Sequence, residues 1–317
     1  MADADAAASR GHAARPPAVR SIVGPTAAGK SAIAMWLAQR HPLVVISADS
    51  RQVYRRFDIG TAKPPAAEQA TVPHRGIDIA EPTRRCSAFA WAAAAVGWIA
   101  EADAAGRVPV IVGGTGLYAR ALFERSFEEP PLGRARRASL EGFLAPMSVQ
   151  ELRRWCEVLD PPRAHLGRTQ LLRAIEVALL SGERLSALHV TRTRPARHAA
   201  RYLVVDPGPA LGDRIATRAR SMLAGGWIEE VRALDASVPA DAPAWNSTGY
   251  RAVRSLVRGE MTEATVLDRV VIETRQYAKR QRTWFRHQLP AASVTRVDPT
   301  AAGWEETIER WWDEGGR

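Results

Sequence analysis

The residues best suited to chemistry form a glycine-rich loop near the start of the chain. Residues 21–34 read SIVGPTAAGKSAIA and match the pattern G-x-x-x-x-G-K-[ST] at Gly24, Gly29, Lys30 and Ser31. The backbone amides of such a loop surround phosphate oxygens, the lysine adds a compact charge, and the serine hydroxyl can ligate a Mg²⁺ ion that the phosphates also hold. The pattern therefore predicts a site for a diphosphate or a longer phosphate chain, and it leaves open whether a nucleotide carries it.

Two further polar residues follow apolar runs that we predict to be strands. Asp49 follows LVVIS (43–47), and Thr115 follows VPVIV (108–112) after two glycines. Ligands of open parallel sheets bind beyond the carboxyl ends of the strands, so we expect both residues to converge on the loop. Asp49 could ligate magnesium, cap the next helix or act as a general base. Thr115 could be a turn residue or a ligand contact.

The elements that must position these residues indicate an α/β fold, with a P-loop-type parallel sheet flanked by helices and a helical insertion domain. The strand signal disappears between residues 117 and 201, where LLRAIEVALLSG (171–182) has helical spacing and ends at Gly182. It returns in RYLVVD (201–206), and the remainder reads as mainly helical. We therefore expect a disordered tail at 1–18, a P-loop-type core at 19–125 with 198–317, and a helical insertion domain at 126–197.

The composition is that of a soluble globular protein. Of its 317 residues, 46% are hydrophobic and 25% are charged. The first 18 residues contain no apolar core of a signal peptide, and no apolar run approaches the length of a membrane span. Cys86 and Cys156 are the two cysteines, which excludes a disulfide framework and a four-cysteine zinc site. We expect a cytoplasmic monomer that does not contact a membrane.

The net charge of +10 favours a polyanionic partner, with a solvated basic surface as the alternative. Part of this charge lies in ETRQYAKRQRTWFR (273–286), where helical spacing places four cations on one stripe, opposite Tyr277 and Trp284. These cations are Arg275, Lys279, Arg282 and Arg286. Like charges at this spacing repel one another unless an anion lies over them, such as a nucleic-acid backbone or the diphosphate.

Two other functions are compatible with these residues taken alone. A small-molecule kinase that uses ATP would need a carboxylate for magnesium, which Asp206 could supply at the end of its strand. A noncatalytic RNA-binding protein would need only the basic charge.

Six motifs in series resemble those of the tRNA dimethylallyltransferases, also called tRNA isopentenyltransferases, of the bacterial type. They occur in the family's order across about residues 20–290 and read GPTAAGKS, ISADSRQVY, DIGTAKP, VGGTGLY, GYR and AKRQRTWFR. The resemblance implies transfer of a dimethylallyl group from dimethylallyl diphosphate, with Mg²⁺, to the exocyclic amine of the adenosine immediately 3′ to the anticodon. The partners it implies are dimethylallyl diphosphate and the tRNA anticodon stem-loop.

The resemblance also implies the site residues. Asp49 would be the general base, and Thr115 would contact the bridging oxygen of the leaving group. Ser31 would ligate the metal. The diphosphate would be held by Gly24, Pro25, Thr26, Ala27, Ala28, Gly29, Lys30, Ser31 and Arg218. Contacts to tRNA would come from Asp49, Ser50, Arg51, Gln52, Thr115, Arg137, Thr169, Gln170, Leu171, Leu172, Arg173, Gly249, Tyr250, Arg251, Lys279, Arg282 and Arg286.

Overall fold

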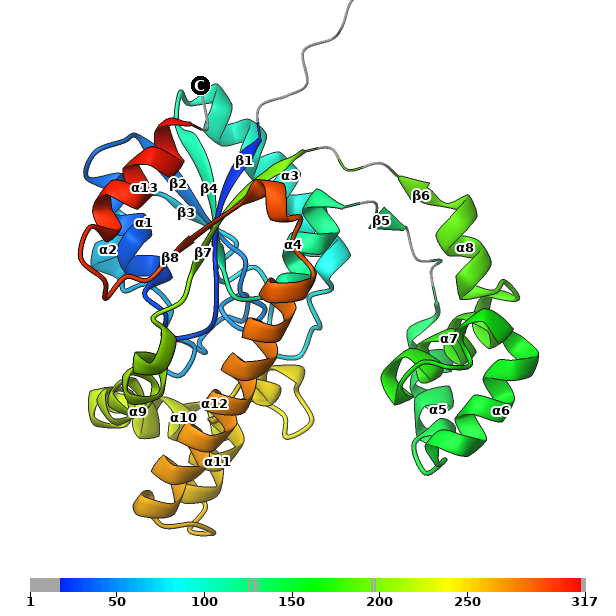
Figure 1. Ribbon diagram of the computed structural model, residues 1–317. Coiled ribbons are helices and arrows are strands. Elements are labelled where there is room, and N and C mark those ends of the chain that lie inside the picture. The colour runs from blue at the N-terminus through cyan, green and yellow to red at the C-terminus, as the bar shows by residue number, and fades with distance from the viewer. Residues whose placement is uncertain are drawn as a thin grey trace, which may run out of the picture. The chain divides into compact units, whose positions relative to one another are not determined.

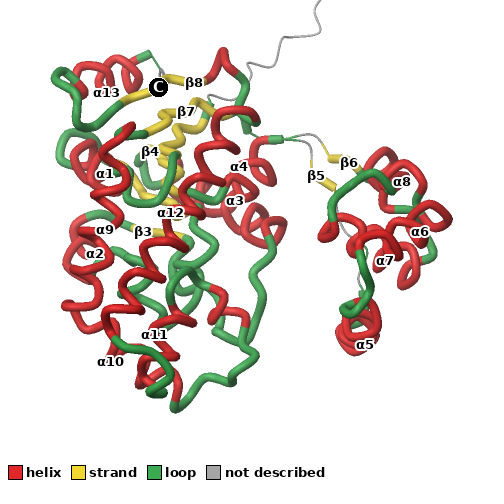
Figure 2. The backbone as a smooth tube through the Cα atoms, turned by 60° about the horizontal axis from the view of Figure 1, so that its bottom comes forward, coloured by secondary structure: helices red, strands yellow, loops and turns green. Residues whose placement is uncertain are grey.

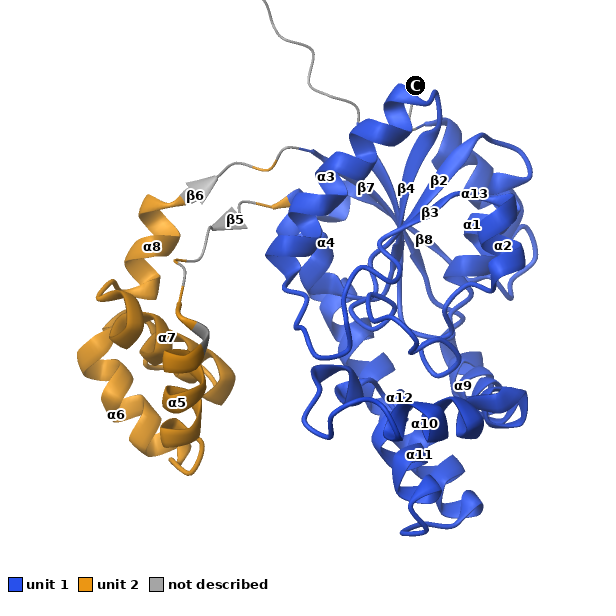
Figure 3. Cartoon of the chain, turned by 180° about the vertical axis from the view of Figure 1, so that it is seen from behind, with its two compact units in different colours: residues 1–123, 197–317 blue, residues 124–196 orange. Residues whose placement is uncertain are grey.

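The computed structural model describes residues 18–314 apart from 125, 128, 129, 131, 195 and 197 (Figure 1). The tail predicted at 1–18 therefore lies outside the described residues, except for its last residue. The chain divides into two compact units, which Figure 3 shows in different colours. Unit 1 is Met1–Phe123 with Arg197–Arg317, and unit 2 is Glu124–Ala196. The insertion domain that the sequence placed at 126–197 overlaps unit 2.

Unit 1 is built on a six-stranded sheet in the order β3-β2-β4-β1-β7-β8, in which every neighbouring pair is parallel. The prediction of a parallel α/β sheet is confirmed. The strands are β1 (Val19–Val23), β2 (Leu43–Ser47), β3 (His74–Arg75), β4 (Val108–Gly113), β7 (Ala200–Val205) and β8 (Val294–Val297). The sequence did not indicate β3 and β8, which form the two edges. Both are short, and β8 lies in a region that reads as helical.

Helices cover both faces of the sheet, because alternate residues of each buried strand point to opposite sides (Figures 1 and 2). Leu43 and Val45 pack with α1 (Lys30–Ala38) and α13 (Trp304–Asp313). Val44 and Ile46 pack with α3 (Ala88–Ala104) and α4 (Gly116–Phe123). Burial on both sides explains why these strands read as continuous apolar runs. The short α2 (Ala66–Thr71) precedes β3.

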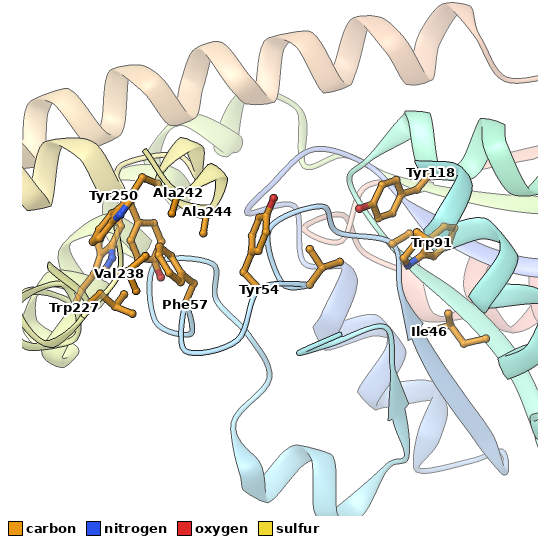
Figure 4. Close-up of a cluster of buried hydrophobic side chains, with 14 of the residues drawn as sticks. Ile46, Tyr54, Phe57, Trp91, Tyr118, Trp227, Val238, Ala242, Ala244 and Tyr250 are labelled. Carbon is orange, nitrogen blue, oxygen red and sulfur yellow. The ribbon is translucent and has the colours of Figure 1, made fainter. Parts of the chain in front are cut away.

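The loop that follows β2 is fixed by a second group of helices in unit 1. Phe57 lies 4.8 Å from Tyr250 and 5.3 Å from Trp245 between ring centroids, and Figure 4 shows it beside Trp227 and Tyr250. Glu230 accepts hydrogen bonds from the backbone N–H of residues 58 and 59 at 3.0 and 2.7 Å. These helices are α9 (Leu211–Met222), α10 (Ile228–Asp235), α11 (Tyr250–Val257) and α12 (Glu263–His287), with a π-helical turn at Leu223–Trp227.

Unit 2 has its own core, formed by α5 (Arg134–Leu144), α6 (Val149–Leu159), α7 (Arg168–Ser181) and α8 (Leu185–Thr191). Ser148 and Glu151 form a capping box that starts α6, and α7 ends at Gly182, whose φ of 75° suits a glycine. The strands β5 (Ser126–Phe127) and β6 (Thr193–Arg194) pair antiparallel. The sequence predicted only helices here, because two-residue strands leave no periodic pattern. Within the described residues, no helix is both long enough and apolar enough to cross a membrane.

The contact between Gly60 and Trp227 predicts a stability effect. A Cβ on Gly60 would lie 2.2 Å from the indole of Trp227, which is 1% exposed and cannot move aside. Gly60→Ala should lower the free energy of unfolding by about 1–3 kcal/mol. Gly97→Ala is the matched control: nothing lies within 4 Å of a Cβ there, in the middle of α3. It should be neutral or stabilise by about 0.5–1 kcal/mol in urea denaturation. Equal effects of the two changes would contradict this account.

Candidate active site

The glycine-rich loop connects β1 to α1 and is held by its own lysine and by two distant helices. Lys30 Nζ donates to the carbonyl oxygen of Pro25 at 2.7 Å. Arg214 of α9 donates through Nε to the carbonyl oxygen of Ala27 at 2.9 Å, and Gln281 of α12 accepts from the N–H of Thr26 at 2.8 Å. The loop conformation is therefore supported by side chains about 190 to 255 residues further along the chain.

Asp49 and Thr115 converge on this loop, as the strand ends predicted. The Ser50 N–H donates to Thr115 Oγ1 at 3.0 Å, and the Thr115 N–H donates to the carbonyl oxygen of Ala48 at 3.1 Å. Asp49 Oδ1 accepts from the Arg51 N–H at 2.8 Å, which fixes the direction of the carboxylate. The segments after β2 and β4 are thus joined directly to each other beside the loop.

A cavity runs along the loop, and its lining combines the cations Lys30 and Arg218 with the carboxylates of Asp49 and Glu68. Thr26, Asp49 and Arg218 line both of two adjoining cavities, the first also lined by Lys30 and the second by Tyr277. Burial lowers the pKa of Lys30 to about 8, an effect that Asp49 opposes and Arg218 reinforces. Burial also lowers the pKa of Arg218, again opposed by Asp49. A bound anion would relieve both cations, so the cavity is suited to phosphate groups.

Tyr277 lines the second cavity from α12. Burial, reinforced by Asp49, raises the pKa of Tyr277 to about 12, so its hydroxyl stays protonated at neutral pH. The sequence placed Tyr277 on the packed face of its helix, which gave no indication that it would line the cavity. Arg214 and Gln281 were missed as well. For Gln281 a signal existed, since it is the one uncharged polar residue inside the run KRQR.

Of the residues predicted to contact tRNA after β2 and in α11, some are already buried and hydrogen-bonded within the protein, and others are exposed. Gln52 points inward, accepting from Ser47 Oγ at 2.8 Å and donating to the carbonyl oxygen of Ala62 at 3.0 Å. Tyr250 is fully buried and donates to Glu230 at 2.6 Å. Arg251 is exposed and contacts Asn246. Of these three residues, Arg251 could contact tRNA directly. Gln52 and Tyr250 would affect tRNA binding only by shaping the surface around them.

In α12 the predicted stripe of four cations is broken at Arg282. Lys279 and Arg286 are exposed, whereas Arg282 is half-buried and donates through Nε to Asp206 Oδ2 at 2.9 Å. Arg282 also contacts Asp206 Oδ1 and the carbonyl oxygen of Gly208. The helical spacing predicted the face of α12 on which Arg282 lies. It could not predict that Asp206, at the end of β7, lies next to that face and pairs with Arg282. The same ion pair occupies the carboxylate that a kinase would need for magnesium.

In unit 2, two of the predicted tRNA contacts share one carboxylate. Arg137 of α5 and Arg173 of α7 both pair with Glu176, which is 5% exposed. Leu171 is fully buried in the core of unit 2, and Thr169 and Gln170 are exposed in the first turn of α7. The pairing fixes the two guanidinium groups next to each other.

The oxygen donors near the loop suit a magnesium ion held mainly by phosphates. Among the described residues, no three His, Cys, Asp or Glu side chains are grouped as they would be for a metal bound by protein alone. Ser31 and Asp49 line the same cavity as Lys30. Mg²⁺ usually keeps several waters and takes one or two protein oxygens with substrate phosphates, so this donor set fits it.

The lowered pKa of Lys30 predicts proton uptake when an anion binds. A diphosphate favours the charged lysine, so pyrophosphate binding at about pH 8.5 should protonate Lys30, and affinity should fall as the pH rises above about 8. Calorimetry in two buffers of different ionisation enthalpy measures the uptake. Lys30→Arg is the comparator, because arginine keeps its charge there and leaves only the protonation of pyrophosphate itself. Equal uptake by both proteins would contradict the assignment.

Comparisons with known proteins agree with this arrangement. The sequence profile of the IPP transferase family matches residues 52–288, and that of the isopentenyl transferase family matches residues 17–74. A tRNA dimethylallyltransferase of an Anaeromyxobacter species is 42% identical over 84% of this chain and 91% of its own length. The tRNA dimethylallyltransferase of Bordetella pertussis is 41% identical over 86% of this chain and 91% of its own length.

Two solved structures resemble the fold. The full-length tRNA isopentenylpyrophosphate transferase of Bacillus halodurans is 32% identical, with a TM-score of 0.66 over 95% of this chain and 96% of its own. A eukaryotic dimethylallyltransferase acting on tRNA is 23% identical, with a TM-score of 0.76 over 92% of this chain and 76% of its own, a likeness of fold. With a profile that covers most of the chain and relatives above 40% identity over most of their length, this protein belongs to the IPP transferase family, that of the tRNA dimethylallyltransferases.

Proposed function

We propose that this protein transfers the dimethylallyl group of dimethylallyl diphosphate to N6 of the adenosine immediately 3′ to the anticodon in tRNA, releasing diphosphate. The observation that carries the proposal is the cavity in which Lys30 and Arg218 lie with Asp49 beside the glycine-rich loop. It combines an anion site with a carboxylate at the place where a nucleophile would arrive. Family membership supports the same reaction.

In this proposal the loop binds the diphosphate and stabilises it as a leaving group. The C1–O bond of the allylic substrate breaks, and its electron pair passes to the diphosphate oxygen. Lys30, Arg218 and the loop amides would neutralise this charge in the cavity beside the loop. Thr115 would donate to the bridging oxygen. A Mg²⁺ ion held by the phosphates and Ser31, when bound, would add further charge neutralisation.

Asp49 would act on the nucleophile. An adenine N6 amine is weakly nucleophilic, since its lone pair is delocalised into the ring, so a carboxylate that accepts one of its protons favours attack on C1. The bond N6–C1 forms as the bond C1–O breaks, and the proton passes to Asp49. The hydrogen bond from the Arg51 N–H keeps one carboxylate oxygen engaged and thereby orients the other. The adenosine would have to leave the anticodon-loop stack to reach this position.

Contacts to tRNA are proposed for both units, each considered by itself. In unit 1 they involve the segment Asp49–Gln52, Arg251 and the exposed cations Lys279 and Arg286 of α12. In unit 2 they involve the start of α7 with the Arg137 and Arg173 pair. Support comes from the exposure of Arg251, Lys279 and Arg286 and from the net charge of +10. We further propose that the protein acts as a monomer in the cytoplasm.

The kinase alternative has little support from these contacts. Asp206, its candidate magnesium ligand, is paired with Arg282 and accepts from the Gly208 N–H at 3.1 Å.

The experiment that tests the function is a prenylation assay. The protein is incubated with dimethylallyl diphosphate, Mg²⁺ and unmodified tRNA whose anticodon is followed by adenosine, and the digested tRNA is analysed by mass spectrometry. The expected product is an adenosine heavier by one dimethylallyl group at that position only. A digest without it would refute the proposal, and ATP consumption in its place would favour a kinase.

Replacement of the general base should affect chemistry far more than binding. Asp49→Asn keeps the shape and a hydrogen-bonding oxygen but cannot take up a proton, so the single-turnover rate should fall by about 10²-fold or more. The affinity for tRNA should stay within about threefold of wild type. Asp241→Asn, an exposed aspartate in unit 1, is the control. A rate for Asp49→Asn within about a factor of three of wild type would reduce Asp49 to an orienting role.

Removal of charge from α12 should change the salt dependence of tRNA binding. For Lys279→Gln or Arg286→Gln, each lost phosphate contact should reduce the slope of log affinity against log salt by about 0.7 to 0.9. Pyrophosphate binding should stay unchanged, because Lys30 and the loop form that site. Arg310→Gln, an exposed cation of α13, is the control. Slopes equal to that of the control would show that α12 does not meet the backbone of tRNA.

A further inference from the structure

Gln281 is a buried residue of the basic helix α12, and both the oxygen and the nitrogen of its side-chain amide form hydrogen bonds. It is 6% exposed, whereas its neighbours Lys279 and Arg280 are exposed. Its Oε1 accepts from the Thr26 N–H at 2.8 Å, and its Nε2 donates to the carbonyl oxygen of Gly114 at 2.8 Å. A single side chain therefore joins the phosphate-binding loop to the turn that follows β4.

These two partners lie on either side of the proposed reaction. Thr26 belongs to the loop that would hold the diphosphate, and Gly114 immediately precedes Thr115. The approach is close, since a Cβ on Gly114 would lie 2.2 Å from Gln281 Nε2. The position of Gln281 is itself fixed, because Ala278 and Phe285 are buried on the same helix and Arg282 is tied to Asp206.

We propose that Gln281 is a positioning residue for the transfer reaction, setting the distance between the phosphate-binding loop and the hydroxyl of Thr115. The proposal rests on the function proposed above. The position requires a group that accepts from one backbone N–H and donates to one backbone carbonyl, over the length of a glutamine side chain. Methionine has the length but cannot donate, and its sulfur accepts only weakly, so it would leave the Gly114 carbonyl without a donor and the Thr26 N–H with a poor acceptor in a buried place.

The primary test is Gln281→Met, which fills the same space without the amide. The single-turnover prenylation rate at saturating substrates should fall at least about tenfold, while the affinity for the tRNA anticodon stem-loop stays within about twofold. Gln39→Met makes the same change at an exposed residue at the end of α1 and should leave the rate unchanged. A wild-type rate for Gln281→Met would show that Gln281 only fills space, and the inference would fall.

A double-mutant cycle separates positioning from general support. Thr115→Val removes the hydroxyl that Gln281 is proposed to place, so Gln281→Met should cost a clearly smaller factor in that background than in the wild type. An equal or larger factor in both backgrounds would show that the loss does not act through Thr115, and it would overturn the proposal.

A second route protects the test against a variant that fails to fold. Gly114→Ala retains the amide but places a methyl group against Nε2, so it should reduce the single-turnover rate in the same way, with unchanged tRNA affinity. A wild-type rate for Gly114→Ala would contradict the proposed link. Absence of prenylation by the wild-type protein would instead refute the proposed function itself, so the two failures are distinguishable.

Discussion

Two cations, Lys30 and Arg218, which share a cavity with the carboxylate of Asp49, constrain the rest of this structure. Burial lowers the pKa of both Lys30 and Arg218, and Asp49 is the charge that opposes the shift for each. A bound anion would raise both pKa values again, and we propose that the diphosphate has this role. Lys30 donates to the carbonyl oxygen of Pro25, which keeps its ammonium group beside the loop.

The fold keeps this arrangement in place through residues from the second half of the chain. Arg214 and Gln281 bind the loop backbone directly, and the cluster of Phe57, Trp227 and Tyr250 fixes the segment after Asp49. The sheet places the strand ends next to one another, but the helices α9 to α12 decide where the loops between them lie (Figure 1). This division explains why family motifs are found both at the sheet and in α11 and α12, far from the phosphate-binding loop in sequence.

The sequence predicted the parts of the site that depend on local pattern. The phosphate-binding loop has its own spacing, and Asp49 and Thr115 follow buried strands whose ends must meet at one edge of a parallel sheet. Contacts between distant segments were not predictable in this way. The periodicity of α12 gave the face on which Arg282 lies, but its partner Asp206 is 76 residues away in the chain. The role of Glu176 could not be predicted for a similar reason, because nothing in the sequence of α7 shows that Arg137 of α5 pairs with it. The edge strand β8 was missed because four residues are too few to give a recognisable strand pattern. Its pairing with β7 is what makes it a strand.

The central claim is that the glycine-rich loop binds the prenyl diphosphate with its bridging atom facing Thr115 and its allylic carbon facing Asp49. A crystal structure with a dimethylallyl diphosphate analogue that carries sulfur at the bridging position tests it most directly. The account predicts phosphate oxygens on the loop amides, Lys30 and Arg218, with the sulfur in contact with Thr115. A diphosphate bound elsewhere, or on the loop with its allylic carbon pointing away from Asp49, would contradict it.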